Sequence, residues 1–322
     1  MSFDNLISIV SNEGVMKKKV LITGVAGFIG SHVANRFLME GFKVVGVDDL
    51  SGGNIENIPK DIEFIQQDLA QESTTDFIPN DCNIILHLAG QSSGEISFDD
   101  PIVDLQKNVF STLNLIKYGL RNKVERIVYA SSMSVYGAVD DKPVNENSLC
   151  KPLSCYGLSK YTSEMYLDIY KESIPSVSMR MFNVYGPGQD MNNLRQGMVS
   201  IFVSQALFNN RIEIKGSLER YRDFIYIDDV VECWFRAATR YTAIGKSINI
   251  GTGVRTTIDE LIQHIRKDMP DIEYYTNGNT PGDQTGIFAD TENLKLHLGI
   301  EKYTPLSLGL HKFIDWAQSI KI

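Results

Sequence analysis

The sequence predicts an α/β fold in which a doubly wound parallel sheet is followed by a smaller, mixed C-terminal lobe. Six short runs rich in β-branched residues are apolar on both faces, as buried strands of a parallel sheet must be. These runs begin at Lys19, Lys43, Ile62, Asn83, Arg126 and Ser176. Amphipathic segments such as "SHVANRFLMEG" and "STLNLIKYGLRN" separate them and have helical spacing. With 322 residues and 43% hydrophobic composition, the chain is large enough to bury this core.

The alternation of strand and helix patterns weakens after the sixth run. Pro187 and Gly188 begin a polar loop, and the residues beyond it mix short strand and helix patterns. We therefore expect a tail at residues 1–16, a large domain at 17–187 and a smaller lobe at 188–322. The chain is expected to cross back between the two units, which makes any single boundary approximate.

The charge balance restricts the class of ligand. The net charge is −9 and the isoelectric point is about 5.1, which disfavours a nucleic-acid or membrane-surface binder. No apolar run reaches membrane-spanning length, and the N-terminus lacks the basic segment of a signal peptide. The four cysteines form no Cys-x-x-Cys pair, which disfavours a metal site and fits reduced thiols in a cytoplasmic protein.

The stretch "LITGVAGFIGSH" joins the first predicted strand to the first predicted helix. Its glycines, Gly24, Gly27 and Gly30, allow a tight turn, close approach of a pyrophosphate and close packing of helix on strand. Phe28 and Ile29 begin the helix, whose N–H groups and positive dipole end favour phosphate. The motif therefore predicts a Rossmann-type dinucleotide site.

Asp48 ends the second predicted strand, about 20 residues after the glycines, where a carboxylate accepts a hydrogen bond from a ribose 2′-hydroxyl. A carboxylate there would repel a 2′-phosphate, and no Lys or Arg follows before Lys60. These two observations favour NAD over NADP as the cofactor.

Two more strand ends are expected to line the same cofactor. Asp68 and Leu69 follow the third strand and are placed on the adenine side. Leu88, Ala89 and Gly90 close the fourth strand, where small residues allow the backbone to lie near the cofactor.

The chemistry is predicted at the end of the fifth strand and the start of a later helix. Ser132 lies at the carboxyl edge of the sheet, where open α/β folds bind ligands. Tyr156 and Lys160 are four residues apart and share one helix face. Lys160 is expected to lower the pKa of Tyr156 by favouring its phenolate, so that Tyr156 can take a proton from a hydroxyl group. We therefore predict Ser132, Tyr156 and Lys160 as the catalytic residues.

With these motifs together, the chain resembles the extended short-chain dehydrogenases/reductases of the NAD-dependent nucleotide-sugar epimerase/dehydratase family, in its UDP-glucose 4-epimerase-like branch. The matching segments occur in order from Lys18 to Asp290 and are "VLITGVAGFIGSH", "VDDLSGG", "HLAGQ", "ASSMSVYG", "YGLSK", "MRMFNVYGPGQ", "RDFIYIDDVV", "INIGTG" and "PGDQTGIFAD". The resemblance implies that Tyr156 is the base, that Ser132 hydrogen-bonds the reacting oxygen, and that Lys160 also holds the nicotinamide ribose.

The resemblance also implies supporting residues and partners. Asn108 matches an asparagine that supports the cofactor site. Asn183 resembles the residue that holds the diphosphate–sugar, and Arg222 the arginine that grips the diphosphate. Asp283, in "PGDQTG", is expected to bind substrate as well. A nucleotide-diphosphate sugar as substrate and a homodimer are the partners that the family implies.

For the reaction, the resemblance implies oxidation of the sugar at C4. The leading interpretation is a 4-epimerase, in which hydride returns to the other face of the 4-keto sugar. The runner-up is a 4-dehydrogenase that releases the ketone. The family's 4,6-dehydratases usually carry Asp-Glu after the catalytic hydroxyl residue, whereas Met133 and Ser134 follow Ser132, which disfavours dehydration. The complete set of Ser132, Tyr156 and Lys160 disfavours an inactive NAD-binding scaffold.

Two departures from the family pattern leave the nucleotide open. Many UDP-sugar epimerases carry an arginine before "PGD", but this chain has Thr280, so either Arg195 or another cation replaces it or the nucleotide sits differently. The loop "QDMNNLRQGMVSIF" also differs from the shorter uridine-lining segment that the family leads us to expect. UDP, GDP, CDP and dTDP sugars are all retained as candidates.

Overall fold

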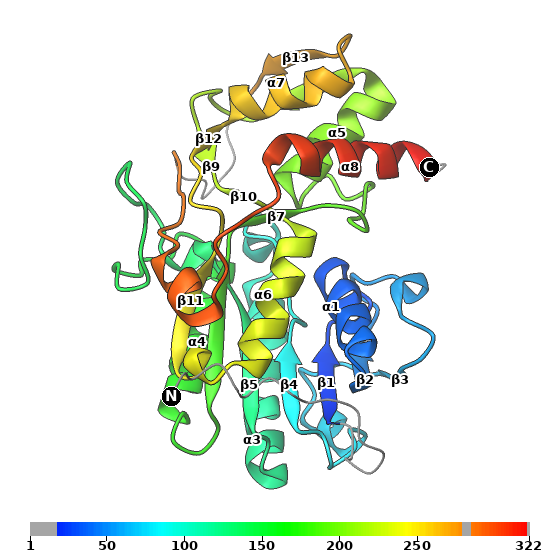
Figure 1. Ribbon diagram of the computed structural model, residues 1–322, viewed down its shortest axis with the longest axis vertical. Helices are drawn as coiled ribbons and strands as arrows, with labels where there is room; N and C mark the ends of the chain where they lie inside the picture. Colours follow the sequence, from blue (N-terminus) through cyan, green and yellow to red (C-terminus); the bar gives the residue numbers. More distant parts are fainter. Residues whose placement is uncertain (1–17, 279–284, 321–322) are drawn as a thin grey trace, which may run out of the picture.

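The computed structural model describes residues 18–278 and 285–320, and its centre is a seven-stranded parallel sheet (Figure 1). The strand order is β11-β6-β5-β4-β1-β2-β3. The strands are β1 (Lys19–Thr23), β2 (Lys43–Asp48), β3 (Glu63–Gln66), β4 (Ile84–His87), β5 (Arg126–Ser132), β6 (Ser176–Met181) and β11 (Lys246–Ile250). The order reverses between β1 and β4, and such a switch point leaves a ligand crevice at the carboxyl ends of the two strands.

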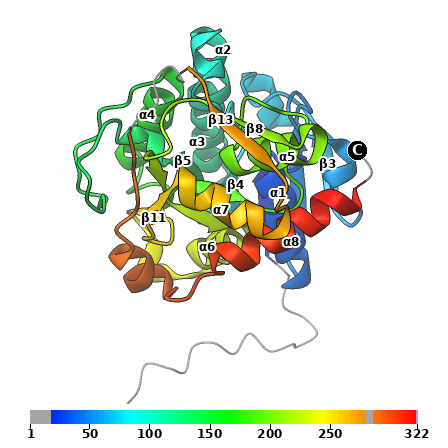
Figure 2. The ribbon, with the colours of Figure 1, turned by 90° about the horizontal axis from the view of Figure 1, so that it is seen from above.

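Helices cover both faces of this sheet (Figure 2). On one face, α1 (Phe28–Met39) packs against α6 (Ile227–Thr239). On the other face lie α3 (Ser111–Asn122) and α4 (Cys155–Ile169). In β1, the side chains of Val20 and Ile22 join the core on the α1 side while Leu21 joins the core on the α3 side. Both faces of the strand are buried, which explains its continuous apolar sequence.

The second unit lies over the carboxyl ends of the sheet strands (Figure 1). Its helices are α5 (Met198–Asn209), α7 (Ile258–Asp268) and α8 (Leu306–Ser319). Three short strand pairs belong to this region: β8 (Arg211–Ile214) with β13 (Glu273–Thr276), β7 (Asn183–Tyr185) with β10 (Phe224–Tyr226), and β9 (Tyr221–Arg222) with β12 (Thr256–Thr257). Helix α7 begins with a capping box between Thr257 and Glu260.

These observations confirm the predicted fold class. Helix α6 and strand β11 come from beyond residue 188 and belong to the layers of the large sheet. The division at 17–187 and 188–322 stays a prediction, and the tail proposed for 1–16 lies outside the described residues. Among the helices that the structure describes, none is long and apolar enough to cross a membrane.

Candidate functional site

The glycine-rich turn between β1 and α1 is packed so closely that side chains would not fit. Gly24 has φ +69°, and a Cβ there would lie 2.8 Å from the backbone nitrogen of Ala89. A Cβ on Gly30 would lie 2.0 Å from the Gly24 carbonyl oxygen. Gly27 caps α1 without a side-chain hydrogen bond, and Phe28 and Ile29 form the first turn. Without a capping side chain, the helix start offers its N–H groups to a phosphate, as a dinucleotide requires.

Asp48 lies where the sequence predicts, at the carboxyl end of β2 beside this turn. Its side chain is 8% exposed and accepts hydrogen bonds from the backbone N–H groups of Ala26 (2.9 Å) and Leu50 (2.8 Å). Burial raises the pKa of this carboxyl, and the two backbone hydrogen bonds oppose that shift. Asp48 thus braces the glycine turn, and its contact with a ribose hydroxyl stays a prediction.

Asp68 follows β3 at the same edge of the sheet, and its carboxylate forms an ion pair. The ammonium group of Lys107 contacts the carboxylates of both Asp68 (3.0 Å) and Asp49 (2.5 Å), a bridge that no sequence pattern indicated. The side chain of Leu69 packs in the core on the α3 side, so only its backbone faces the predicted adenine region.

The end of β4 is held by a chain of hydrogen bonds. The Thr23 hydroxyl accepts from the backbone N–H groups of Leu88 and Ala89 (both 3.1 Å) and lies 2.9 Å from Nδ1 of His87. With both N–H groups donating to it, this hydroxyl donates to Nδ1, so Nε2 of His87 carries the proton and donates to the Thr112 hydroxyl (3.1 Å). Burial lowers the pKa of His87 to about 3, which keeps the ring neutral.

Gly90 ends this segment with φ +155°. A Cβ there would lie 2.4 Å from Oδ1 of Asn108 and 3.3 Å from Nζ of Lys160. Asn108 and Lys160 therefore face the same point at the switch between β1 and β4. Only glycine leaves room at this point, which fits the predicted approach of a cofactor to the backbone.

The three predicted catalytic residues come together at the carboxyl end of β5 and the first turns of α4. The Ser154 hydroxyl caps α4 by accepting from the N–H of Gly157 (3.1 Å), so the helix starts just before Tyr156. Ser132, Tyr156 and Lys160 are 8%, 9% and 3% exposed. Nζ of Lys160 lies 5.7 Å from the centre of the Tyr156 ring. Within the described part of the chain, Nζ forms no hydrogen bond.

The electrostatics of this pair differ from the sequence-based expectation. Burial raises the pKa of Tyr156 to about 12, against the opposing effect of the Ser132 hydroxyl. Burial likewise lowers the pKa of Lys160 to about 8. The prediction that Lys160 holds the pKa of Tyr156 down is wrong for this protein structure, because desolvation outweighs the attraction of a lysine that does not contact the hydroxyl. A further positive charge beside Tyr156 would favour the phenolate.

Asn108 lies in a π-helical turn, Gln106–Phe110, between α2 (Pro101–Leu105) and α3. Its Nδ2 donates to Asp104 (3.1 Å), while Oδ1 is buried without a hydrogen-bond partner among residues 18–278 and 285–320. A buried acceptor left unpaired costs about 1–3 kcal/mol, so Oδ1 is placed for a donor from a ligand. This orphan acceptor, the open helix start and the crowded Gly24 and Gly90 all fit the residues to NAD.

Asp104 is a site residue that the sequence analysis missed. It is fully buried and also accepts from the Ser159 hydroxyl (2.6 Å), next to Lys160. Its spacing of four from Asn108 in a helical segment was the available signal, since residues i and i+4 face each other.

A buried ion pair supports the catalytic elements from behind. Arg180 of β6 and Glu164 of α4 contact at 2.7 Å, with side chains 5% and 6% exposed. The Ser131 hydroxyl donates to the same Glu164 carboxylate, and Arg180 also donates to the Tyr136 hydroxyl (3.0 Å). This network joins β5, β6 and α4 and thereby fixes Ser132 relative to Tyr156.

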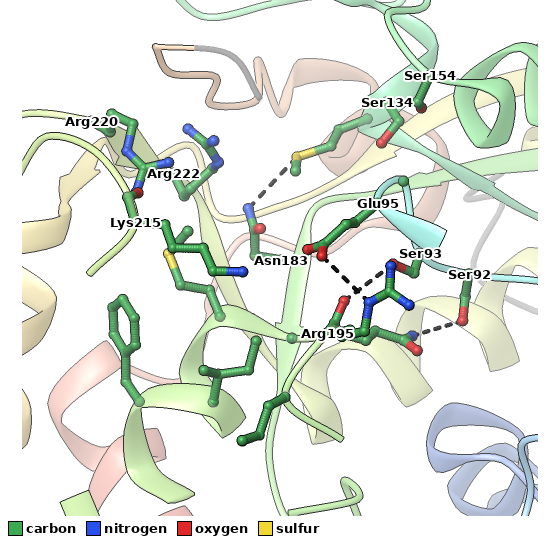
Figure 3. A pocket seen from close by; sticks show the side chains of 18 of the residues that line it. Ser92, Ser93, Glu95, Ser134, Ser154, Asn183, Arg195, Lys215, Arg220 and Arg222 are labelled. Carbon is green, nitrogen blue, oxygen red and sulfur yellow. Dashed lines mark hydrogen bonds and ion pairs between the residues drawn. The ribbon is translucent and has the colours of Figure 1, made fainter. Parts of the chain in front are cut away.

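A cleft of about 320 Å³ lies between the sheet and the second lobe, beside the predicted catalytic residues. Figure 3 shows Asn183 near its centre, Arg220, Arg222 and Lys215 on one wall, and the Arg195–Glu95 pair on the other. Met133, Ser134 and Ser154 line the end nearest the catalytic residues, whereas Ser132 and Tyr156 lie just behind that end. The size suits a small-molecule ligand.

Asp223 follows the buried Arg222 in the chain and also holds Asn183. Asn183 donates from Nδ2 to the carbonyl oxygen of Asp223 (3.0 Å), and Arg222 is 4% exposed. The Asp223 carboxylate is fully buried and accepts from the backbone N–H groups of Thr252 (2.8 Å), Gly253 (2.9 Å) and Ala289 (3.1 Å) and from the Thr252 hydroxyl (2.6 Å). Three chain segments meet at this carboxylate.

Arg195 does not occupy the same wall as Arg222. It pairs with Asp99 (2.8 Å) and Glu95 (3.4 Å), and its side chain is 45% exposed. The cations beside Arg222 are instead Lys215 and Arg220, which the sequence analysis did not single out. The available signal was "RYR", because residues i and i+2 of an extended segment lie on the same side. Asp283 and Thr280 lie outside the described residues.

The described lining of the cleft carries four cationic side chains, Arg195, Lys215, Arg220 and Arg222, and two carboxylates, Glu95 and Glu213. Its net charge is therefore +2 in a chain whose net charge is −9. A nucleotide diphosphate carries about two negative charges, so the cleft has the charge complement that such a ligand requires.

Comparison with known proteins gives consistent matches. Residues 20–251 match the model of the NAD dependent epimerase/dehydratase family. A UDP-glucose 4-epimerase of Mycolicibacterium smegmatis is 36% identical over 255 residues, which cover 76% of this chain and 80% of that protein. A UDP-glucose 4-epimerase of Thermotoga maritima, solved with UDP-glucose, superposes with a TM-score of 0.90 at 32% identity, covering 93% of this chain and 98% of that one. A UDP-glucose 4-epimerase of Thermus thermophilus, solved with NAD, gives 0.86 at 30% identity, covering 94% and 99%.

Proposed function

Because the chain belongs to the NAD-dependent epimerase/dehydratase family, we propose that it is a nucleotide-sugar 4-epimerase whose cofactor is NAD. The observation that carries this proposal is the position of Ser132, Tyr156 and Lys160. They lie between a glycine turn suited to a dinucleotide and a cleft whose charge suits a diphosphate.

In the proposed reaction, Oη of Tyr156 takes the proton of the sugar C4 hydroxyl, and the Ser132 hydroxyl hydrogen-bonds the same oxygen. NAD held at the glycine turn, Gly90 and Asn108 would supply the acceptor and donor of the C4 hydride and a positively charged nicotinamide ring. That charge supplies what the Tyr156 site lacks, since a neighbouring positive charge lowers the pKa of a phenol. Lys160 adds an ammonium group beside both residues.

The residues after Ser132 support epimerisation over dehydration. The sulfur of Met133 accepts a hydrogen bond from Asn183 (3.6 Å), and the hydroxyl of Ser134 accepts one from Ser132 (3.2 Å). Neither side chain can remove a C5 proton or protonate a leaving hydroxyl. Of the two carboxylates in the described lining, Glu95 is paired with Arg195, and Glu213 accepts a hydrogen bond from Asn277 (2.7 Å).

For the substrate we propose a UDP-sugar, because the two UDP-glucose 4-epimerases of Mycolicibacterium smegmatis and Thermotoga maritima are similar to this chain over most of its length. Arg222 is proposed to contact the diphosphate. Lys215 and Arg220 are proposed to supply the second cation, in place of Arg195, which is engaged with two acidic residues on the opposite wall.

The test is turnover of UDP-, GDP-, CDP- and dTDP-hexoses by the purified protein, with products resolved by chromatography. Recovery of a C4 epimer with no net NADH supports the epimerase. Stoichiometric NADH with a released ketone would replace it by the 4-dehydrogenase.

We also propose that the protein is a homodimer. Helices α3 and α4 pack side by side and leave large apolar side chains exposed on the same face of the sheet. The exposed residues of the two helices are Leu120, Leu158, Met165 and Ile169, and Phe110 precedes α3. Such a face on two adjacent helices suits isologous pairing with a second copy. Light scattering of the wild type and of Ile169→Glu should give a dimer and a monomer, respectively.

A further inference from the structure

One fully buried carboxylate, Asp104, connects α4 and the π-helical turn of Asn108 and is not part of the described cleft lining. It lies in α2, which packs against α4. Its Oδ2 accepts from the Ser159 hydroxyl of α4 (2.6 Å), and its Oδ1 accepts from Nδ2 of Asn108 in the π-helical turn (3.1 Å). Both donors are side chains with rotatable bonds, so Asp104 fixes their orientation.

The bond to Asn108 decides which atom of its amide faces the cofactor region. Because Nδ2 is engaged with Asp104, Oδ1 is directed to the point at which a Cβ on Gly90 would lie, 2.4 Å away. Nζ of Lys160 approaches the same point, at 3.3 Å. If the Asn108 amide were flipped, its NH₂ group would face the ammonium of Lys160, and two donors would meet there.

The backbone of Asn108 is fixed independently. The π-helical turn leaves its carbonyl oxygen outside the regular helix pattern, and the hydroxyl groups of Thr112 (2.7 Å) and Ser163 (3.1 Å) donate to it. The position of the residue is therefore secured without Asp104, and Asp104 controls only how its side chain is turned.

We propose that Asp104 is a positioning residue for the proposed C4 oxidation: it holds the Asn108 amide with Oδ1 toward the cofactor, and it places one negative charge against α4, the helix that carries Tyr156 and Lys160. The proposal rests on the proposed function for its kinetic consequence only. The orientation and the charge are properties of the protein itself.

The other charged or titratable groups around the pair do not supply this charge. His87 of β4 is neutral, because burial lowers its pKa to about 3. Nζ of Lys160 lies 5.1 Å from the centre of the Tyr129 ring of β5. Burial raises the pKa of Tyr129, so Tyr129 stays a neutral phenol. Glu164 of α4 is balanced by Arg180. Asp104 itself raises the pKa of both Tyr156 and Lys160, so its removal should move both titrations toward acid.

The experiment compares Asp104→Asn with Ser159→Ala in the NAD-loaded enzyme. The first variant removes the charge and keeps the shape, whereas the second removes one hydrogen bond and keeps the charge. The first readout is ultraviolet difference absorbance of tyrosinate, with Tyr156→Phe in each background to isolate Tyr156, over the pH range in which circular dichroism shows a folded protein. The second is the pH dependence of kcat/KM.

We expect Asp104→Asn to shift the Tyr156 titration and the acid limb of the profile to lower pH by roughly half a unit or more. We expect kcat to fall at least about tenfold, since the Asn108 amide loses its fixed orientation. Ser159→Ala should leave the acid limb in place. If Asp104→Asn does not fold, Asp104→Ser replaces it in the comparison, because this variant also removes the charge.

An unchanged Tyr156 titration in the charge-removing variant would overturn the proposal and leave Asp104 a packing residue. If the wild type turned over no nucleotide sugar, the proposed function would fail while the tyrosinate titration still decided the role of Asp104.

Discussion

The proposed catalytic residues and the cleft wall of Arg222 each have a fully buried aspartate nearby, Asp104 and Asp223 respectively. The two carboxylates differ in the groups that donate hydrogen bonds to them. Asp104 accepts from two side chains, Ser159 and Asn108. Asp223 accepts from three backbone N–H groups and one hydroxyl. A carboxylate held by backbone groups fixes the path of the chain, whereas one held by side chains fixes only their orientation. We therefore expect a change at Asp104 to affect the proposed chemistry and a change at Asp223 to affect the architecture.

The largest expected effect is a loss of activity at the proposed catalytic residues. Tyr156→Phe should lower kcat about a thousandfold, because it removes the proposed base, while leaving NAD binding intact. Steady-state kinetics and NAD titration measure the two effects. The matched control is Tyr129→Phe, whose hydroxyl is buried without a hydrogen-bond partner among the described residues, and which should change kcat little. Comparable losses in both variants would contradict the assignment of Tyr156 as the base.

The next effect concerns architecture. Asp223→Asn should lower the free energy of unfolding by about 3 kcal/mol, because an amide NH₂ would face N–H donors that the carboxylate now satisfies. Urea unfolding measures this change. Asp228→Asn, at an exposed position in the same region, should stay within about 0.5 kcal/mol of the wild type. Equal stability of the two variants would remove the architectural role from Asp223.

A smaller effect separates the two walls of the cleft. Arg222→Lys should raise KM for the nucleotide sugar about thirtyfold with a lesser change in kcat, because a lysine cannot supply the planar guanidinium fork. Arg195→Lys should raise KM less than about threefold, since exposed ion pairs such as those with Glu95 and Asp99 contribute little. The reverse order of these two variants would place the diphosphate on the Arg195 wall.

The gradual effect is the pH dependence of stability that His87 of β4 produces. His87 has a pKa of about 3 in the folded protein and about 6.5 when unfolded, so between these values only the unfolded state binds the proton. Stability from this residue is full above pH 6.5 and falls as pH falls, by about 1.4 kcal/mol per pH unit. Urea unfolding at a series of pH values should show a flatter acid slope in His87→Gln. An identical slope would mean that His87 is not the titrating group.

The cofactor side of the molecule was largely predictable from sequence. Gly24, Gly30 and Asp48 lie within one strand–turn–helix–strand unit, and local chain geometry brings such residues together in any sheet of this type. The positions of Ser132 and Tyr156 at neighbouring element ends followed from the same rule. Their roles stay predictions, as does the homodimer.

The substrate side was less predictable. Arg195 was considered as the second cation, yet its loop turns it toward Glu95 and Asp99, while Lys215 and Arg220 line the wall beside Arg222. Asp104 was missed because its partner Ser159 is 55 residues away in sequence. The sequence analysis expected a lowered pKa for Tyr156, whereas burial raises it. Residue spacing indicates which side chains are neighbours on a helix, but it does not indicate how deeply they are buried.

The sequence by itself determined the parallel α/β fold and the positions of the glycine turn and of Ser132, Tyr156 and Lys160 at element ends, because these depend on contiguous patterns and on the direction in which strands end. Only the tertiary structure decided which cations line the cleft wall beside Arg222 and which carboxylate accepts a hydrogen bond from Ser159 of α4. It also decided that Tyr156 is buried, which raises its pKa to about 12. The physical reason is that desolvation and side-chain contacts depend on segments that are far apart in the chain, and packing alone brings those segments together.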